Sequence, residues 1–336
     1  MKYLLEIHHG IGDVVKYTGL IKSVKTYDKE AYIGVVLNKD AYKELFFLDN
    51  DIDYIHVIDF SGNKRKLIKE ILSIRRTKYD YMVCSYHSSQ MSMEFMAVAF
   101  GAKKVAGSKL ERLRKFSEKY IHVPLKNEHE IKRNYNILLG LNPEFSFFEP
   151  YLICPLPPYP LSGRTIGLCI GTSLPHKTWP IERYIAVGEY FEKRGYDIVL
   201  LGGNKEAEHF DSVGYTNEKW INLLGKTDLI ESASECSLCT LVIGGDTGLM
   251  CMAAAVGTTT LTLFSCSDPF INTPYSTHSY YYYVPTSCQF CFGTHCLDEC
   301  RDYKCLNNIT IEKVIEIAEG ILANPMSVEK QRLKVK

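Results

Sequence analysis

Short apolar runs alternate with helix-like stretches along nearly the whole chain of 336 residues. In the first half, the strand-like runs are 3–7, 31–37, 52–58, 81–85 and 101–107, and the helical patterns are 14–24, 40–47, 64–76 and 91–100. Such alternation favours strand–helix–strand units whose strands run parallel. We therefore expect an α/β fold built on parallel sheets.

The second half repeats this pattern after a proline-rich segment. Residues 150–160 contain five prolines, which no regular element accommodates well, and a fresh strand begins at Thr165. A chain of this length can form two domains, each with its own core. We place the domains at residues 1–155 and 164–325, and expect ligand-binding loops at the strand ends to line a cleft between them.

Residues 242–255 form the stretch around which we expect the chain to be organised. An apolar strand ends at two glycines, continues through Asp246, Thr247 and Gly248, and restarts as a helix of small residues. This layout leaves backbone N–H groups at a helix N-terminus, which favours a phosphate, and Asp246 could accept hydrogen bonds from sugar hydroxyls. The alternative is an ordinary turn in which Asp246 or Thr247 caps the helix.

Two loops of the first half also follow strands. Asp13 lies in a glycine-bearing loop at or near a helix start, where the helix dipole favours a carboxylate, and the alternative is a helix cap. His87, Ser88 and Gln90 follow the strand at 81–85 and are candidate substrate contacts, because ligands of open α/β sheets bind beyond the carboxyl ends of strands. A polar surface loop is the alternative for these three residues.

Composition narrows the class of protein. The formal net charge is zero and 46% of the residues are hydrophobic, which removes the bulk electrostatic argument for nucleic-acid binding. The first apolar run is too short for a signal peptide, and no stretch approaches the roughly 18 apolar residues of a membrane span. We expect a cytoplasmic protein. The basic runs 109–115 and 330–336 are solvated surface, or contacts for an anionic acceptor and for anionic phospholipid at the inner face of the cell's inner membrane.

Twelve cysteines are many for a reducing compartment. Seven are scattered through apolar stretches and read as small buried hydrophobes. The other five crowd into a loop at 287–306, where a Cys-x-x-Cys pair and further thiolates match the ligand set of a tetrahedral zinc or iron site. The expected ligands are Cys288, Cys291 and Cys305, with Cys296 or Cys300 as the fourth, and unligated thiols are the alternative.

Four motifs in order resemble those of glycosyltransferase family 9, which includes the heptosyltransferases that transfer heptose from ADP-heptose to the lipopolysaccharide core. These are Gly-Ile-Gly-Asp at 10–13, Gly-Thr-Ser at 171–173 with Lys-Thr-Trp-Pro at 177–180, Asn-Leu-Leu-Gly-Lys-Thr at 222–227, and the stretch at 242–255. The resemblance implies the GT-B fold, in which two Rossmann-like domains face each other, with the acceptor on the first and the nucleotide sugar on the second.

The resemblance also implies roles for individual residues. Asp13 would be the general base, and an acceptor attacking directly would invert the anomeric carbon. Gly12, His87 and Gln90 are candidates on the acceptor side. The donor-binding residues would be Thr172, Ser173 and Lys177 at the diphosphate, the amides of Thr247, Gly248 and Leu249 beside it, Glu206 at the ribose, Leu224 and Gly225 at the base, and Asp246 at the transferred sugar. No cofactor and no metal ion would be needed at the donor, because fixed positive groups can stabilise the leaving diphosphate.

Several points stay open. Cys251 stands where the family commonly has histidine, so the donor could carry another sugar. Cysteine-bearing loops occur at the place of 287–306 in some members, including a metal-binding finger in those that glycosylate autotransporter proteins. The acceptor could be a lipopolysaccharide core sugar, another surface glycan or a protein hydroxyl. The alternative functions are a GT-B transferase or epimerase acting on a different nucleotide sugar, and a non-catalytic nucleotide-sugar-binding module. The oligomeric state is not indicated.

Overall fold

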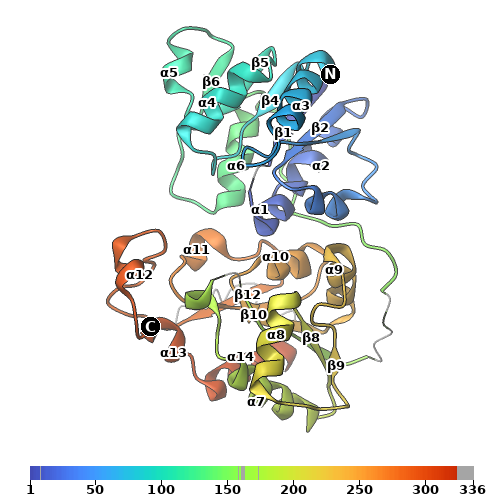
Figure 1. Ribbon diagram of the computed structural model, residues 1–336, viewed down its shortest axis with the longest axis vertical. Coiled ribbons are helices and arrows are strands. Elements are labelled where there is room, and N and C mark those ends of the chain that lie inside the picture. Colours follow the sequence, from blue (N-terminus) through green and yellow to red (C-terminus); the bar gives the residue numbers. More distant parts are fainter. Residues whose placement is uncertain (8, 158, 160–162, 173, 324–336) are drawn as a thin grey trace. The chain divides into compact units, whose positions relative to one another are not determined.

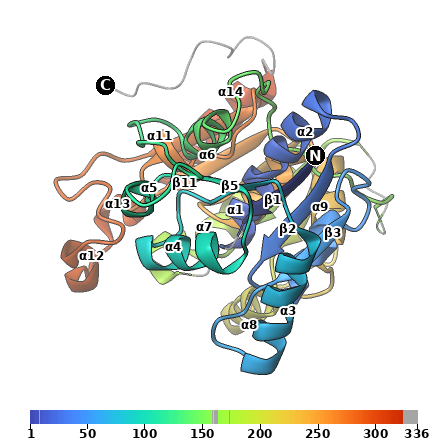
Figure 2. The same cartoon turned by 90° about the horizontal axis from the view of Figure 1, so that it is seen from above.

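The computed structural model describes residues 1–7, 9–157, 159, 163–172 and 174–323. The chain divides into two compact units, Met1–Ile153 and Cys154–Lys336, and each unit holds one parallel sheet with helices packed on it (Figures 1 and 2). Within the described ranges, no helix combines the length and apolar character needed to cross a bilayer.

The first unit contains a six-stranded sheet with the strand order β3-β2-β1-β4-β5-β6. Its strands are β1 (Lys2–Glu6), β2 (Tyr32–Leu37), β3 (Tyr54–Val57), β4 (Tyr81–Val83), β5 (Lys104–Gly107) and β6 (Tyr120–His122). Its helices are α1 (Ile11–Lys16), α2 (Thr18–Tyr27), the 3-10 helix η1 (Asp40–Phe46), α3 (Lys64–Thr77), α4 (Gln90–Ala99), α5 (Glu111–Arg114) and α6 (Glu130–Leu139).

The central strands of this sheet are buried, as expected for a parallel sheet covered by helices. Leu4 of β1 pairs in register with Gly34 of β2 and Met82 of β4. Ile74 of α3 and Met93 of α4 join the same apolar cluster as Leu4 and Met82, so α3 and α4 cover one face of the sheet.

The helix expected at 14–24 is instead two helices, and this part of the expectation is wrong. The chain turns at Tyr17, where the Thr18 hydroxyl donates a 2.8 Å hydrogen bond to the Val15 carbonyl and accepts one of 2.8 Å from the Tyr151 amide. A Ser or Thr hydroxyl that bonds a nearby carbonyl competes with regular helix geometry. The helical pattern at 40–47 forms the tighter 3-10 helix η1.

The second unit repeats the architecture, with the strand order β12-β11-β10-β7-β8-β9. Its strands are β7 (Thr165–Cys169), β8 (Asp197–Leu201), β9 (Ile221–Asn222), β10 (Leu241–Gly245), β11 (Thr260–Phe264) and β12 (Ser279–Tyr283). Its helices are the 3-10 helix η2 (Pro175–Lys177), α7 (Ile181–Glu192), α8 (Asn204–Val213), α9 (Leu229–Leu238), α10 (Gly248–Ala255), α11 (Pro269–Asn272), α12 (His295–Glu299), α13 (Lys304–Asn307) and α14 (Ile311–Ala323).

Trp179 anchors the core of this unit. Its ring is buried edge-on against Tyr184 of α7, and its indole nitrogen donates a 3.0 Å hydrogen bond to the Ile309 carbonyl. Val314 and Ile317 of α14 join the same apolar cluster. The segment leading into α14 is thereby fixed to the start of α7.

Each sheet has one place where the order of strands reverses. In the first unit the chain proceeds from β1 to β2 and β3 on one side, then returns to β4 on the other; in the second, β7 leads to β8 and β9 before the chain returns to β10. Ligands of open α/β sheets bind beyond the carboxyl ends of the strands at such reversals. The loops after β1 and β4, and those after β7 and β10, are therefore the expected positions of ligand-binding residues.

Candidate functional site

At the reversal in the first unit, Asp13 meets His87. Asp13 lies in α1, just after β1, and His87 lies in the loop after β4. The imidazole Nε2 of His87 is 3.3 Å from Asp13 Oδ1, and the Gly10 amide donates a 3.2 Å hydrogen bond to Asp13 Oδ2. Asp13 therefore caps the start of α1 and also presents a carboxylate at the strand ends. Its side chain is 23% exposed and that of His87 is 28% exposed, so both can be reached from solvent.

Glu130, the first residue of α6, holds His87 from the other side. Its Oε2 lies 3.0 Å from His87 Nε2 and accepts a 3.0 Å hydrogen bond from the Tyr86 hydroxyl, while its Oε1 is paired with the Lys16 ammonium. The Glu130 side chain is only 1% exposed. His87 Nε2 thus contacts the carboxylates of both Asp13 and Glu130, and the buried Lys16 ammonium neutralises the charge of Glu130.

These contacts set the charges of the cluster. Burial lowers the pKa of His87, but its hydrogen bonds and charge interactions with Asp13 and Glu130 outweigh burial and raise the pKa to about 9. Burial raises the pKa of Asp13, but the hydrogen bond and charge of His87 bring it below its ordinary value. Burial also opposes ionisation of Glu130, yet the charge of Lys16 holds the Glu130 pKa far below its usual range. At neutral pH the cluster contains two carboxylates, an imidazolium and an ammonium.

A second buried carboxylate supports the same loop. Glu6, at the end of β1, accepts a 2.7 Å hydrogen bond from the Ser85 amide and bonds of 3.0 Å from the Ser88 hydroxyl. Ser88 is buried and positions the loop through its hydrogen bonds to Glu6, and its role as a substrate contact stays a prediction. Gln90 starts α4, where its side-chain amide donates a 3.1 Å hydrogen bond to Glu94 Oε1 on the exposed side of the helix. Gly12 lies in α1 beside Asp13.

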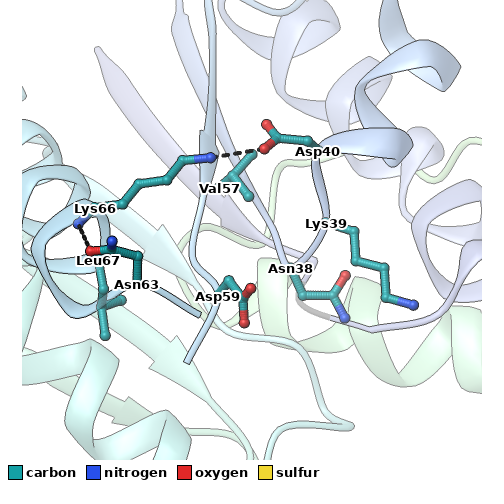
Figure 3. A pocket seen from close by; sticks show the side chains of 8 residues that line it. All are labelled: Asn38, Lys39, Asp40, Val57, Asp59, Asn63, Lys66 and Leu67. Carbon is teal, nitrogen blue, oxygen red and sulfur yellow. Dashed lines mark hydrogen bonds and ion pairs between the residues drawn. The ribbon is translucent and has the colours of Figure 1, made fainter. Parts of the chain in front are cut away.

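A polar pocket of about 230 Å³ lies at the carboxyl ends of β2 and β3 (Figure 3). Asn63 caps α3 at its rim by accepting hydrogen bonds from the amides of Arg65 and Lys66, at 2.8 and 3.3 Å. The Lys66 ammonium also lies 2.9 Å from Asp40 Oδ2. The other lining residues are Asn38, Lys39, Val57, Asp59 and Leu67. The pocket offers groups of both charges to a ligand at this edge of the sheet.

At the reversal in the second unit, Lys177 meets Asp246. The Lys177 ammonium, which follows β7, lies 2.6 Å from Asp246 Oδ2, which follows β10. The Ser267 hydroxyl donates a second 2.6 Å hydrogen bond to the same oxygen, and the ring of Phe292 lies 4.3 Å from the ammonium. The pair is largely buried. It places a cation and a carboxylate beside the start of α10.

Thr247, and not Asp246, caps α10. The Thr247 hydroxyl accepts a 3.2 Å hydrogen bond from the Leu249 amide, and Gly248 is the first helical residue. The Leu249 amide therefore already has a partner within the helix cap. Cys251 is buried in α10. Because the cap is provided by Thr247, the Asp246 carboxylate is available to Lys177 and Ser267.

Gly245 allows the two loops to approach closely. A Cβ at this position would lie 2.8 Å from the Lys177 carbonyl oxygen and 2.9 Å from Thr172 Cγ2. The Thr172 hydroxyl in turn donates a 2.7 Å hydrogen bond to the Leu174 carbonyl and lies 3.0 Å from the Thr178 hydroxyl. Thr172 thus shapes the turn before Lys177. Ser173 lies outside the described residues.

Glu206, Leu224 and Gly225 gather at the ends of β8 and β9. Glu206 packs against Gly171 and accepts a 2.9 Å hydrogen bond from the Gly203 amide. Leu224 is part of the core, so its side chain serves the fold. Gly225 has φ +66°, a backbone conformation that favours glycine, and its amide donates a 3.0 Å hydrogen bond to the Gly202 carbonyl. Together these residues form a rim that borders the loop after β7, where Glu206 contacts Gly171.

The five cysteines of the loop 287–306 lie close enough to interact electrostatically with one another or with Cys266. All twelve cysteines are free thiols. Burial, with the nearby thiols of Cys266 and Cys288, raises the pKa of Cys305 to about 11. Among the described residues, three potential ligand atoms come within 4.8 Å of one another only at Asp13, His87 and Glu130. The sulfurs of the loop thus supply suitable donor atoms, but this structure does not bring three of them to ligating separations.

Several residues of these clusters were not expected from the sequence. Glu130, Lys16 and Tyr86 came from no motif, and neither did Ser267. A lysine inside an otherwise apolar helix, as at Lys16 between Val15 and Tyr17, is a signal for a buried ion pair, because lysine is almost never fully buried without a partner. The signal does not say which carboxylate is the partner.

Comparison with known sequences identifies relatives. The model of glycosyltransferase family 9 (heptosyltransferase) matches residues 73–301. Lipooligosaccharide heptosyltransferase 2 of Haemophilus influenzae is 32% identical over 117 residues, covering 33% of this chain and 34% of that protein. The match thus spans about a third of the length of that relative. Lipooligosaccharide heptosyltransferase 2 of Campylobacter jejuni is 24% identical over 340 residues, covering 96% of this chain and 99% of that protein.

Comparison with solved structures identifies the fold. The crystal structure of a family 9 glycosyltransferase from Veillonella parvula superposes with a TM-score of 0.83 at 23% identity, covering 96% of this chain and 97% of that one. The E. coli ADP-heptose lipopolysaccharide heptosyltransferase II gives a TM-score of 0.76 at 20% identity, covering 97% and 99%. The expected α/β fold of the GT-B type is confirmed. The family expected from the four motifs is confirmed as well: the chain belongs to glycosyltransferase family 9, the heptosyltransferase family.

Proposed function

We propose that this protein is an inverting glycosyltransferase that transfers a heptose from ADP-heptose to a hydroxyl group of a bacterial glycan or a protein. The observation that carries the proposal is the pair of clusters at the two strand-order reversals. One presents an ionised carboxylate, Asp13, and the other presents an ammonium, Lys177, beside the start of α10. An E. coli heptosyltransferase of the same fold has been solved with ADP-2-deoxy-2-fluoro heptose, which supports an ADP-sugar as the donor.

On the donor side, the diphosphate would lie against the Lys177 ammonium and the amides at the start of α10. Negative charge grows on the diphosphate as the bond from the anomeric carbon to the phosphate oxygen breaks. Fixed positive donors stabilise that charge, and removing one well-aimed donor costs about 3–4 kcal/mol in comparable sites. Thr172 and Ser173 would contact the phosphates, and Glu206 would contact the ribose. Leu224 and Gly225 would flank the base. Asp246 would accept hydrogen bonds from the sugar.

On the acceptor side, Asp13 would take the proton of the attacking hydroxyl as the new bond from oxygen to the anomeric carbon forms. The contact with His87 keeps this carboxylate ionised and fixes its orientation. A positioned general base of this kind contributes roughly 10²–10⁴-fold to rate. Because the acceptor attacks directly as ADP leaves, the configuration at the anomeric carbon inverts.

The test uses Asp13→Asn, which keeps the shape of the side chain and the hydrogen bond from Gly10 but removes the base. We expect turnover to fall by at least about 10²-fold while affinity for ADP-heptose stays within a few-fold of wild type. The readout is ADP release in the presence of an acceptor, together with calorimetric binding of the donor. A near-normal rate removes Asp13 as the base. Binding and turnover of a uridine sugar without any response to ADP-sugars refutes the proposed donor.

We also propose that Cys288, Cys291 and Cys305, with Cys296 or Cys300, hold a structural zinc or iron ion. The support is the clustering of these thiols in one loop, and a glycosyltransferase of the same fold from enterotoxigenic E. coli is described as iron-containing. Closing the sulfurs around an ion would tie α12 and α13 together. Elemental analysis of protein kept reduced is the test, and the absence of both metals refutes the site.

Twelve free thiols also support a reducing, cytoplasmic setting.

A further inference from the structure

Helix α4 exposes an apolar stripe. Met91 is 81% exposed, Phe95 47% and Val98 52%, and their spacing places them along one side of the helix. The opposite side, with Met93 and Met96, is buried in the core. Apolar side chains thus lie on two sides of α4, with Ser92 and Glu94 between them. The outer stripe of α4 therefore presents the kind of contiguous apolar surface that marks an interaction site.

Helix α3 extends this surface. Ile68 is 58% exposed and Leu72 is 44% exposed, again on the side away from the core residue Ile74. The two helices are neighbours, since Arg75 of α3 donates a 2.9 Å hydrogen bond to the Ala99 carbonyl at the end of α4. The ring of Phe60, which precedes α3, lies edge-on to the ring of Phe95 in the middle of α4, with 5.9 Å between the ring centroids. We call this surface the α3–α4 face, after the two helices labelled in Figure 1. Its six exposed apolar members are Phe60, Ile68, Leu72, Met91, Phe95 and Val98.

The charges that accompany the α3–α4 face are mainly positive. Along α3, Ile68 and Leu72 share their stripe with Arg65, Lys69 and Arg76, which are all exposed. Beyond α4, the exposed side chains of Arg112, Arg114 and Lys115 follow in and after α5.

Three acidic side chains near this face have partners within the chain, whereas Glu111 at the start of α5 is exposed. Glu70 lies 3.4 Å from the imidazole of His56, Glu94 lies 3.8 Å from Arg112, and Asp59 accepts hydrogen bonds from Ser61. Exposed apolar side chains are thus interleaved with cations that outnumber the anions.

We propose that the α3–α4 face docks on the surface of a bilayer that contains anionic phospholipid. The apolar side chains would enter the boundary between headgroups and acyl chains, and the arginines and lysines would meet the lipid phosphates. Amphipathic helices with basic polar sides bind membranes in this way, by apolar burial together with attraction to anionic lipid. A second copy of the chain fits less well, because a two-fold contact would set the same basic rows against each other.

The experiment is co-sedimentation of the full chain with vesicles of phosphatidylglycerol and phosphatidylcholine in equal parts, and with phosphatidylcholine alone. We expect binding to the anionic vesicles that weakens as salt is added. Met91→Ser with Phe95→Ser should reduce the partition coefficient by about tenfold or more. Arg65→Gln with Lys69→Gln should reduce it by about fivefold for each charge removed.

Phe47→Ser is the matched control, since Phe47 is exposed at the end of η1 and lies outside the α3–α4 face. It should bind as wild type does, and circular dichroism checks that every variant is folded. The proposal is overturned if the wild type ignores anionic vesicles or if the α4 variant binds unchanged. It is also overturned if Lys334→Gln with Lys336→Gln abolishes binding, since the tail alone then carries it. Sedimentation velocity showing that the α4 variant dissociates a wild-type oligomer would assign the face to a second copy.

Discussion

Replacing His87 with glutamine should change how the stability of this protein depends on pH. In the folded state the His87 imidazolium lies 3.3 Å from Asp13 and 3.0 Å from Glu130, and its pKa is raised to about 9. In the unfolded chain the pKa of histidine is about 6.5. A raised pKa means that the folded state binds the proton more tightly, so the stabilisation is complete below pH 6.5 and is lost as pH rises through about 9.

The size of this effect follows from the difference between the two pKa values. Each pKa unit corresponds to about 1.4 kcal/mol, so the difference of about 2.5 units amounts to about 3 kcal/mol. We compare the free energy of unfolding of wild type with that of His87→Gln. The advantage of wild type should be about 3 kcal/mol larger below pH 6.5 than above pH 9. Glutamine keeps a hydrogen-bond donor but carries no charge, which isolates the electrostatic part.

Urea unfolding of both proteins across this pH range measures the difference directly. His209→Gln, on the exposed side of α8, is the control and should change stability little at any pH. An NMR titration of the His87 ring gives an independent readout. A difference between wild type and His87→Gln that stays constant with pH, or a ring that titrates near 6.5, would refute the assigned charges.

Three further substitutions test other contacts. Lys16→Met should lower the free energy of unfolding by about 3–5 kcal/mol because it leaves the buried Glu130 carboxylate without its ammonium, and adding Glu130→Gln should recover part of the loss in urea unfolding. Lys177→Ala should weaken binding of ADP-heptose as well as turnover, measured by calorimetry and ADP release, and unchanged affinity would contradict its role at the diphosphate. Gly245→Ala should lower the free energy of unfolding by about 1–3 kcal/mol and weaken donor binding, because the new Cβ would press on the Lys177 carbonyl. A melting temperature and a donor affinity equal to those of wild type would show that the two loops move apart to accommodate the Cβ.

The fold could be predicted from the sequence because its signals are local. Each buried parallel strand is a short apolar run, and the prolines between 150 and 160 bracket the division after Ile153. The break between α1 and α2 was missed because it depends on contacts of Thr18 with Tyr151, which lies far along the chain. A helical pattern alone does not report such a contact.

The candidate site was accessible from the sequence only in part. Asp13, His87, Lys177 and Asp246 each follow a strand, and that position is visible in the sequence. Their pairing is not visible, because it depends on β1 lying beside β4 and β7 lying beside β10. Glu130 is separated from His87 by 43 residues and belongs to a helix that follows the last strand of the sheet, so no local motif connects them.

The bond between Lys177 and Asp246 has a consequence for ligand discrimination. A lone ammonium at a helix start would attract any small anion, but here its charge is already neutralised by a carboxylate at 2.6 Å. A free phosphate would have to compete with that carboxylate, and among the described residues it would leave Asp246 with the Ser267 hydroxyl as its side-chain partner. A nucleotide sugar could replace both partners at once, with its phosphate for Lys177 and its hydroxyls for Asp246. The closed pair would thus act as a filter that admits a ligand only when phosphate and sugar arrive together.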